Sequence, residues 1–599
     1  MTETKPNLLP IIAGAAVVVA GGIGAYFFFN KASVPPTGVA GTGTLTIVPQ
    51  KSLMAMSIST DGSALTQLEQ FLSPETKKTY DKAIAQFKNS LASGDFDYEK
   101  DVKPWIGKNV TIAFLPSTKT ANLLPSQSQD SIQNRIQNRY VPMNNTGSIQ
   151  FVQNKDTPEK GAEKGAEKTA PAPQTIPNLL LVIEVKDKVS AEKFLTEKIK
   201  TKAGGSEKPS EYKGIKITQY GEASKTVSTA MVGDYLIITP QEQSTQKAID
   251  TFKGEASLAS SMSADDLKLK NPVAQVYIPN FGESIVELAA LNPNAETIPP
   301  ESLAQLKKVK AMNMGFGIDD AGLRFKVSGK FDPATITALK NSPNKIMGML
   351  PSQSFSVITG FNLKNSWEEF VKSADKTPEI KKGIDDARSQ LKSSPLAIDL
   401  DKDIFGWMDG EFAIATVSSK PEGVLAQTQG LAPVLMFQTS NRAGAESLLK
   451  KFDDFAAKNG AKVAQKDVSG VAVTEWSASG PGPGAIMSHG WNQKDTFFFT
   501  FSPIVSLFVP KPAITLDADP AFKAIVSTLP TNNVGYFYID VDKTWSIYQT
   551  ILPPAEKEKI PADIKAWIES VRGLAVTAAY PNQETAEVEA ILALKKGGK

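Results

Sequence analysis

The chain has 599 residues, of which 41% are hydrophobic and 21% are charged, and it contains no cysteine. Its 65 basic residues nearly cancel its 63 acidic ones, so we expect no nucleic-acid partner. Without cysteine the chain cannot form disulfides, thiolate nucleophiles, iron–sulfur clusters or Cys-ligated zinc sites. The length is sufficient for several domains, each with a buried core.

The first element is an uncharged apolar stretch of 22 residues, Leu8–Phe29. As a helix rising about 1.5 Å per residue it would extend roughly 33 Å, enough to cross a hydrocarbon core of about 30 Å. A cleaved signal peptide is the alternative, but its apolar region is normally only about 7 to 15 residues long. We therefore predict a tail and transmembrane anchor over 1–31. The short tail before a large body favours translocation of the body across the membrane.

A spacer rich in Pro, Gly and Thr, residues 32–44, should hold the body away from the bilayer. The body then begins with alternating apolar residues typical of strands. Two helix-like stretches follow, one over Leu65–Leu72 and one that begins at Pro74. The second half of the chain has the same order, with helix-like stretches around Trp367 and Ile384.

In both halves these stretches lead to one repeated motif. Residues 97–113 and 399–415 align over seventeen residues without a gap at a constant offset of 302, which pairs Trp105 with Trp407. Internal self-similarity of this kind indicates a duplicated unit. We interpret Trp105 and Trp407 as structural anchors of the repeated core rather than ligand platforms, because tryptophan is mostly buried on average.

Acidic residues occupy alternate positions in both copies of the motif, namely Asp97, Glu99, Asp101, Asp399, Asp401 and Asp403. Carboxylates at this spacing resemble the start of a calcium loop, so these six residues are metal-ligand candidates. The pattern lacks the glycine at the sixth position and the acid at the twelfth that such a loop requires. We therefore favour a structural role in which Asp101 and Asp403 cap a short helical turn, with no metal bound.

Residues 117–175 have no counterpart in the second half. They are rich in Ser, Gln and Asn and end in EKGAEKGAEKTAPAPQ, so we predict a disordered insertion. Beyond it the halves align again, at an offset of about 254. Each continues with a strand, a helix (Ala191–Lys202 and Ala445–Lys458) and further strands, the last of which is predicted over Tyr235–Thr239 in the first half. A third module repeats at an offset of 261, where residues 271–280 match 532–540.

Few residues suit catalysis. His489 is the only histidine, which excludes an HExxH zinc site and any multi-histidine metal centre. Its neighbour Ser488 cannot form a triad with it, since adjacent side chains rarely point at one another and no acid partner can be assigned. The apolar stretch Phe497–Val509 could line a cavity for a lipid or pigment, but we favour a buried strand. We predict no cofactor.

This layout resembles a family of single-pass, internally duplicated cyanobacterial membrane proteins known only as a domain of unknown function. The features that match are the apolar anchor, the Pro/Gly spacer and a D-[VI]-x-x-W-[IM]-x-G motif. The motif stands here as Asp101–Gly107 and, with one more residue before the glycine, as Asp403–Gly410. The resemblance covers nearly all of 45–595 and implies a cyanobacterial membrane location with the body in the periplasm or thylakoid lumen. It implies no activity, cofactor or catalytic residue.

We therefore predict an α+β protein of two homologous halves behind an N-terminal transmembrane helix. Each half should contain about three small modules of largely antiparallel sheet with packed helices. The first repeat unit covers 45–340, a link covers 341–351 and the second unit covers 352–599.

The predicted function is non-enzymatic binding or scaffolding of a membrane-associated protein partner. One alternative is a carrier of a lipid or other hydrophobic ligand. A hydrolase that uses carboxylates or serine is the other, and we disfavour it because the usual general base is missing.

Overall fold

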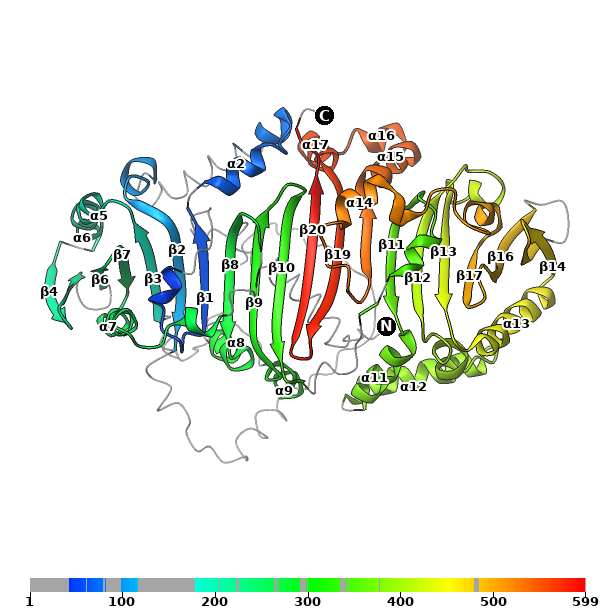
Figure 1. Cartoon of the computed structure of the whole chain (residues 1–599), viewed down its shortest axis with the longest axis horizontal. Coiled ribbons are helices and arrows are strands. Elements are labelled where there is room, and N and C mark those ends of the chain that lie inside the picture. The colour runs from blue at the N-terminus through cyan, green and yellow to red at the C-terminus, as the bar shows by residue number, and fades with distance from the viewer. Residues whose placement is uncertain are drawn as a thin grey trace, which may run out of the picture.

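All strands among the described residues belong to one antiparallel sheet that runs the length of the molecule (Figure 1). The computed structural model describes residues 43–597 apart from 61, 79–80, 82–97, 117–177, 204, 222–225, 263–266, 268, 291–297, 299, 334–340, 343, 376 and 479–483. The chain is therefore α+β, as predicted. Instead of several small sheets, the modules share a single sheet, because strand β1 pairs with β8 and strand β3 pairs with β7.

The strands of residues 54–331 form one half of the sheet. From the outer edge inward they are β4 (Glu207–Tyr212), β5 (Ile215–Tyr220), β6 (Val227–Val232), β7 (Tyr235–Thr239), β3 (Asn178–Val185), β2 (Ile106–Leu115), β1 (Met54–Ser59), β8 (Pro272–Pro279), β9 (Val309–Ile318) and β10 (Gly322–Phe331).

The strands of residues 354–594 form the other half. From the centre outward they are β20 (Thr585–Leu594), β19 (Val571–Asn582), β18 (Tyr536–Asp540), β11 (Ser354–Phe361), β12 (Glu411–Ser418), β13 (Leu431–Gln438), β17 (Thr496–Phe501), β16 (Ala485–Trp491), β15 (Val471–Ala478) and β14 (Ala461–Val468).

Two-residue turns close the outermost hairpin at each end of the sheet. Lys213 and Gly214 join β4 to β5 with φ angles of 49° and 77°, and Ser469 and Gly470 join β14 to β15 with 53° and 85°. Two consecutive residues with positive φ give the turn whose twist matches that of the flanking strands, and glycine adopts such angles without strain. The sequence thus fixes both hairpins locally.

Helices lie along both long sides of the sheet (Figure 1). In the first half they are α2 (Ser63–Glu69), α5 (Lys188–Phe194), α6 (Lys200–Lys202), α7 (Glu242–Phe252), α8 (Phe281–Ala290) and α9 (Pro300–Leu306). In the second half they are α11 (Leu363–Ala374), α12 (Pro378–Ser393), α13 (Arg442–Lys458), α14 (Pro520–Val526), α15 (Val541–Ile551), α16 (Pro554–Lys557) and α17 (Ala562–Ser570).

The first amides of a helix have no hydrogen-bond partner within the helix, and polar side chains accept hydrogen bonds from them at the start of several of these helices. Asp187 accepts hydrogen bonds from the first turn of α5, Asn441 from α13 and Asp540 from α15. The predicted helical stretches near Leu65, Trp367, Ile384 and Ala191 are all helical in the structure. Of the stretch predicted from Pro74, only its beginning lies among the described residues.

The two halves meet where β10 pairs with β20, from Gly322 opposite Ala593 to Lys330 opposite Thr585. We call this pairing the seam. Arg324 on β10 is 5% exposed and donates hydrogen bonds to Asp319 at 2.6 Å, to Glu589 on β20 and to Thr528. Because unpaired buried charges are costly, these partners favour the observed register of the seam over slipped alternatives.

The segments predicted as spacer and as link contain residues that are packed in the structure. Thr44, the last residue of the predicted spacer, is fully buried. In the predicted link, residues 345–349 form a short helix, and Ile346 and Leu350 lie in the core of the second half. The predicted anchor Leu8–Phe29 and the insertion 117–175 lie outside the described residues. Within the described part, no helix is long and apolar enough to span a bilayer.

Candidate functional site

Each repeated tryptophan follows a short π-helical turn and precedes a strand. Trp105 stands between the turn Tyr98–Val102 and β2, and Trp407 follows the turn Leu400–Phe405 just before β12. Both side chains are 2% exposed. The indole of Trp105 donates to the carbonyl of Asp101 at 2.7 Å, and the indole of Trp407 donates to the carbonyl of Asp403 at 2.8 Å. The two motifs therefore share one local geometry.

The surroundings of the two tryptophans are apolar. Trp105 packs against Phe194 of α5 with ring centroids 5.3 Å apart. Trp407 makes edge contacts with Phe437 of β13 and Phe497 of β17, at 5.5 and 6.0 Å. Edge-to-face contacts of this kind add to the stabilisation from burial alone. Neither indole is available to a ligand in this arrangement.

The glycine that ends each motif allows a close approach of the next strand. A Cβ atom on Gly107 would lie 2.7 Å from the Glu184 side chain, and one on Gly410 would lie 2.5 Å from the Gln438 carbonyl. Real Cβ contacts are essentially never shorter than 3.0 Å. The motif glycine is therefore a packing requirement at the junction with β3 and β13.

The motif acids bond within the chain. Asp101 forms an ion pair with Lys198 at 3.0 Å, and Asp403 pairs with Lys451 of α13. Burial acts to raise the pKa of Asp403, but hydrogen bonds from Lys451 and from the Asp399 amide outweigh it and hold the pKa below its usual range. In both halves, then, a lysine from the following helix neutralises the aspartate that precedes the tryptophan.

Two of the remaining acids, Asp399 and Glu99, also have partners in the structure. Asp399 caps the π-helical turn, because its side chain accepts hydrogen bonds from the amides of Asp401 and Lys402 at 3.1 and 2.9 Å. The sequence analysis predicted this capping role for Asp403 instead. Glu99 pairs with Lys103 at 2.6 Å. Asp97 lies outside the described residues. Among those described, no three His, Asp or Glu side chains are arranged to hold a metal ion.

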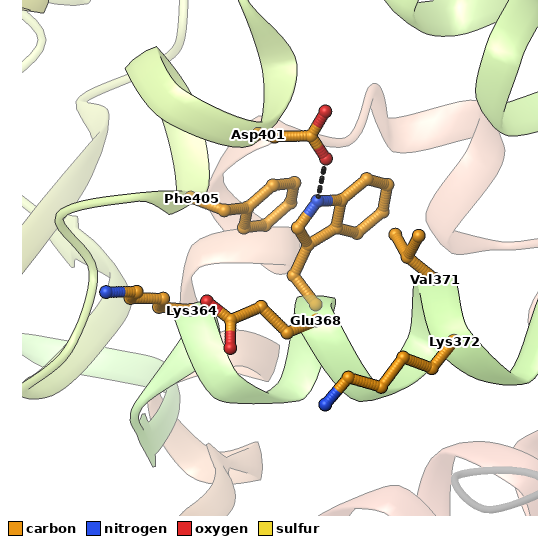
Figure 2. A pocket seen from close by; sticks show the side chains of 7 residues that line it. Lys364, Glu368, Val371, Lys372, Asp401 and Phe405 are labelled. Atoms are coloured by element: carbon orange, nitrogen blue, oxygen red, sulfur yellow. Dashed lines mark hydrogen bonds between the residues drawn. The ribbon is translucent and has the colours of Figure 1, made fainter.

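A shallow pocket of about 290 Å³ lies beside the second motif (Figure 2). It is lined by Lys364, Trp367, Glu368, Val371 and Lys372 of α11 together with Asp401 and Phe405 of the π-helical turn. Trp367 stacks on Phe405 with ring centroids 4.4 Å apart and an interplanar angle of 13°. Figure 2 shows Asp401, Phe405 and Val371 around the pocket, and its dashed line marks the hydrogen bond from the Trp367 indole to Asp401.

Asp401 fixes the back of this pocket. It accepts from the indole of Trp367 at 2.7 Å and from Nε and Nη2 of Arg388 at 2.7 and 2.8 Å. The two hydrogen bonds from Arg388 of α12 form a planar fork, which is the strongest form of arginine–carboxylate pairing. The Arg388 guanidinium holds the pKa of Asp401 below its usual range. Three separate elements are thus locked together around Trp367.

His489 lies at a different place, on β16. Its Nε2 is 2.8 Å from Asp453 of α13, and the indole of Trp476 donates to the same carboxylate at 2.7 Å. Ser488 bonds instead to Ser502 at 2.7 Å. Because successive side chains of a strand point to opposite faces, Ser488 and His489 are on different sides of the sheet and form no nucleophile–base pair.

The apolar stretch Phe497–Val509 is largely buried, as the sequence analysis favoured, but it is a strand only as far as Phe501, where β17 ends, and Ser502–Leu507 form a short 3-10 helix. Phe498 is fully buried and packs edge-on against Phe508 at 5.2 Å. Phe497 is 6% exposed and contacts Trp407 and Phe437. These rings fill the interior with one another, and none of them lines the pocket beside α11.

The sequence analysis singled out one pocket residue, Asp401, and only as a metal-ligand candidate. It identified Trp367 as an apolar position of a helix and Phe405 as one position of the motif Asp403–Gly410, and it did not name Arg388. One available signal was the contrast between the halves, because the offset of 302 places Leu65 opposite Trp367 and Lys103 opposite Phe405.

The family model described as "Protein of unknown function (DUF3352)" matches residues 11–594, so the chain belongs to this family. No curated protein matches the chain. Similar solved structures include crystal forms III, IV and I of TP0453, with identities of 10%, 10% and 9% and TM-scores of 0.23, 0.22 and 0.21. Each covers 50% of this chain and 80%, 82% and 80% of its own length, respectively.

Proposed function

We propose that this member of the DUF3352 family is a membrane-anchored, non-enzymatic protein that binds a membrane-associated protein partner outside the cytoplasm. The proposal combines the apolar segment Leu8–Phe29 with an exposed surface on the sheet. Sidedness is testable by protease treatment of sealed vesicles. Digestion of the body from the cytoplasmic side would contradict the extracytoplasmic placement.

One observation carries the binding role. Ile358 of β11 pairs directly with Ile414 of β12 and with Phe537 of β18, so the three side chains lie in a row on one face of the sheet. We call them the exposed row. They are 43%, 41% and 36% exposed, respectively. Contiguous exposed apolar groups on a folded protein mark interaction surfaces more often than isolated ones do.

The strand positions next to the exposed row are uncharged. On the same face, the positions two residues along are Phe412 on β12, Ser356 on β11 and Ile539 on β18. The row continues across the sheet through Val576 and Ala590, which are half-buried. These strands already pair with neighbours on both sides, so their backbone offers a partner no free sheet edge. A partner must therefore bind through apolar side chains, which fits the apolar face of a protein better than a charged ligand.

The carrier and hydrolase alternatives have less support. The phenylalanine-rich strand that suggested a lipid cavity packs against protein side chains. His489 pairs with Asp453 and stands on the opposite face from Ser488. We therefore treat a hydrophobic ligand as an outcome of the experiment below rather than as a second proposal.

Site-specific photo-crosslinking in native membranes tests the partner. A crosslinking residue at Ile358 or Ile414 should yield one protein adduct of discrete mass. The matched control is Ile514, which is 57% exposed but lies outside the row and should yield none. Adducts with lipid alone would support the carrier instead. Equal protein adducts at all three positions would show that the row is not a specific surface.

We also infer that the two halves arose by duplication. Outward from the seam, the strands of residues 54–331 follow the same connection order as those of residues 354–594. The Trp motifs and the outer hairpin turns recur at matching places in this order. Failure of the two halves to superpose strand for strand would contradict this inference.

A further inference from the structure

Most side chains of the pocket beside α11 have no counterpart in the first half, although Asp401 aligns with the acid Glu99. Trp407, Asp403 and Lys451 have equivalents in Trp105, Asp101 and Lys198, so they serve the repeated fold. By contrast, the offset of 302 places Leu65 at the position of Trp367, Lys103 at that of Phe405 and Gln86 at that of Arg388. The repeated fold therefore does not require the pocket, which makes it a candidate for a separate role.

The wall of the pocket is rigid. Arg388 holds both oxygens of Asp401, and Asp401 in turn holds the indole of Trp367. Phe405 stacks on the same indole. Side chains that are fixed by a second layer of contacts are pre-organised to bind, because little conformational freedom remains to be lost.

Two opposite charges on the rim have no side-chain partner among the described residues, and the Glu368 carboxylate is exposed to solvent. Lys364 and Glu368 lie one turn apart on α11, and neither side chain makes a hydrogen bond or an ion pair with the described chain. Lys372, one turn further along, pairs with Glu369 at 2.7 Å. The charges that line the pocket are two lysines, Glu368 and Asp401, so they sum to zero.

We propose that this pocket binds a small zwitterion with an apolar side chain, which is the chemistry of a free α-amino acid. Glu368 takes the ammonium group, Lys364 takes the carboxylate, and the side chain lies against Trp367 and Val371. A volume of about 290 Å³ falls just below the roughly 300 Å³ at which sites for drug-sized ligands begin, so a ligand of this small size fits. This proposal goes beyond partner binding at the exposed row and is independent of it.

Calorimetric titration of the full-length chain in detergent tests the ligand class. The probes are L-leucine and L-phenylalanine, and the blocked analogues are N-acetyl-L-phenylalanine, which lacks the ammonium, and L-phenylalanine amide, which lacks the carboxylate. We expect saturable binding of the free amino acids and binding of each analogue weaker by about tenfold or more, since each loses one charged hydrogen bond. Absence of saturable binding at millimolar concentration, or equal binding of the analogues, would overturn the proposal.

Substitutions of the two rim charges distinguish recognition of the ligand from a general disturbance of the fold. Glu368→Gln should abolish the discrimination against the N-acetyl analogue but keep the discrimination against the amide, and Lys364→Gln should do the reverse. Glu379→Gln and Lys382→Gln on the neighbouring α12 are the matched controls and should leave all affinities unchanged. If both pocket variants weaken every probe by the same factor, they act on the fold and the assignment of the two charges is wrong.

Discussion

Replacement of Arg324 by methionine tests whether the buried charges at the seam stabilise the fold. The Arg324 and Asp319 side chains are 7% and 8% exposed, and Glu589 is 11% exposed. The substitution leaves two nearly buried carboxylates without their cation. Removal of one partner from a buried ion pair typically costs about 3–5 kcal/mol, so we expect the free energy of unfolding to fall by about that amount.

The assay is urea denaturation of the full-length chain in detergent, followed by tryptophan fluorescence. Lys310→Met is the matched control, because it removes an ion pair with Asp332 whose side chains are 53% and 54% exposed. Such surface pairs contribute little. The double variant Arg324→Met/Glu589→Met should be less destabilised than Arg324→Met alone, since it removes one orphaned charge. A loss below about 1 kcal/mol for Arg324→Met, or a loss equal to that of Lys310→Met, would refute burial of these charges as the reason.

Three further changes have expected outcomes. Trp407→Ala should lower the free energy of unfolding by about 3–5 kcal/mol in the same assay, because it empties a fully packed aromatic site, and Trp407→Phe should cost less. Gly410→Ala should destabilise by about 1–3 kcal/mol, since its Cβ would overlap the Gln438 carbonyl, whereas Gly383→Ala, with open space around it and no left-handed backbone, should not destabilise the protein. Burial raises the pKa of Tyr580 to about 12. With a folded pKa above the unfolded value of about 10, Tyr580 contributes stability that is present below pH 10 and lost as the pH rises towards 12, and Tyr580→Phe should lack this loss in denaturation measured across that range.

Local pattern was enough to predict many elements of the fold. The strand predicted over Tyr235–Thr239 has those bounds in the structure, because an unbroken apolar run ends at Pro240. The helix predicted over Ala445–Lys458 is helical throughout, within α13, since its apolar side chains recur at helical spacing. These features depend on contacts within one segment, so a single sequence contains the information for them.

The arrangement of the modules could not be predicted in this way. Arg324 and Glu589 are 265 residues apart, and nothing local in either strand shows that β10 and β20 are neighbours. The same applies to the pocket, where Trp367 and Asp401 are separated by 34 residues and Arg388 approaches from a third element. Pairings of this kind depend on tertiary geometry, whereas the repeated Trp motif was visible because it occurs twice.

The seam also affects how the chain folds during its synthesis. Strand β10 leaves the ribosome long before its partner strand β20, since Arg324 and Glu589 are 265 residues apart. During that interval its outer edge has no partner, and bare edges invite aggregation. Arg324 and Lys326 place positive charge on β10 while it has no partner strand. This charge discourages association with other nascent chains. Once β20 is in place, the same two side chains form ion pairs with Glu589 and Glu587. They would therefore first protect β10 from aggregation and afterwards stabilise its pairing with β20.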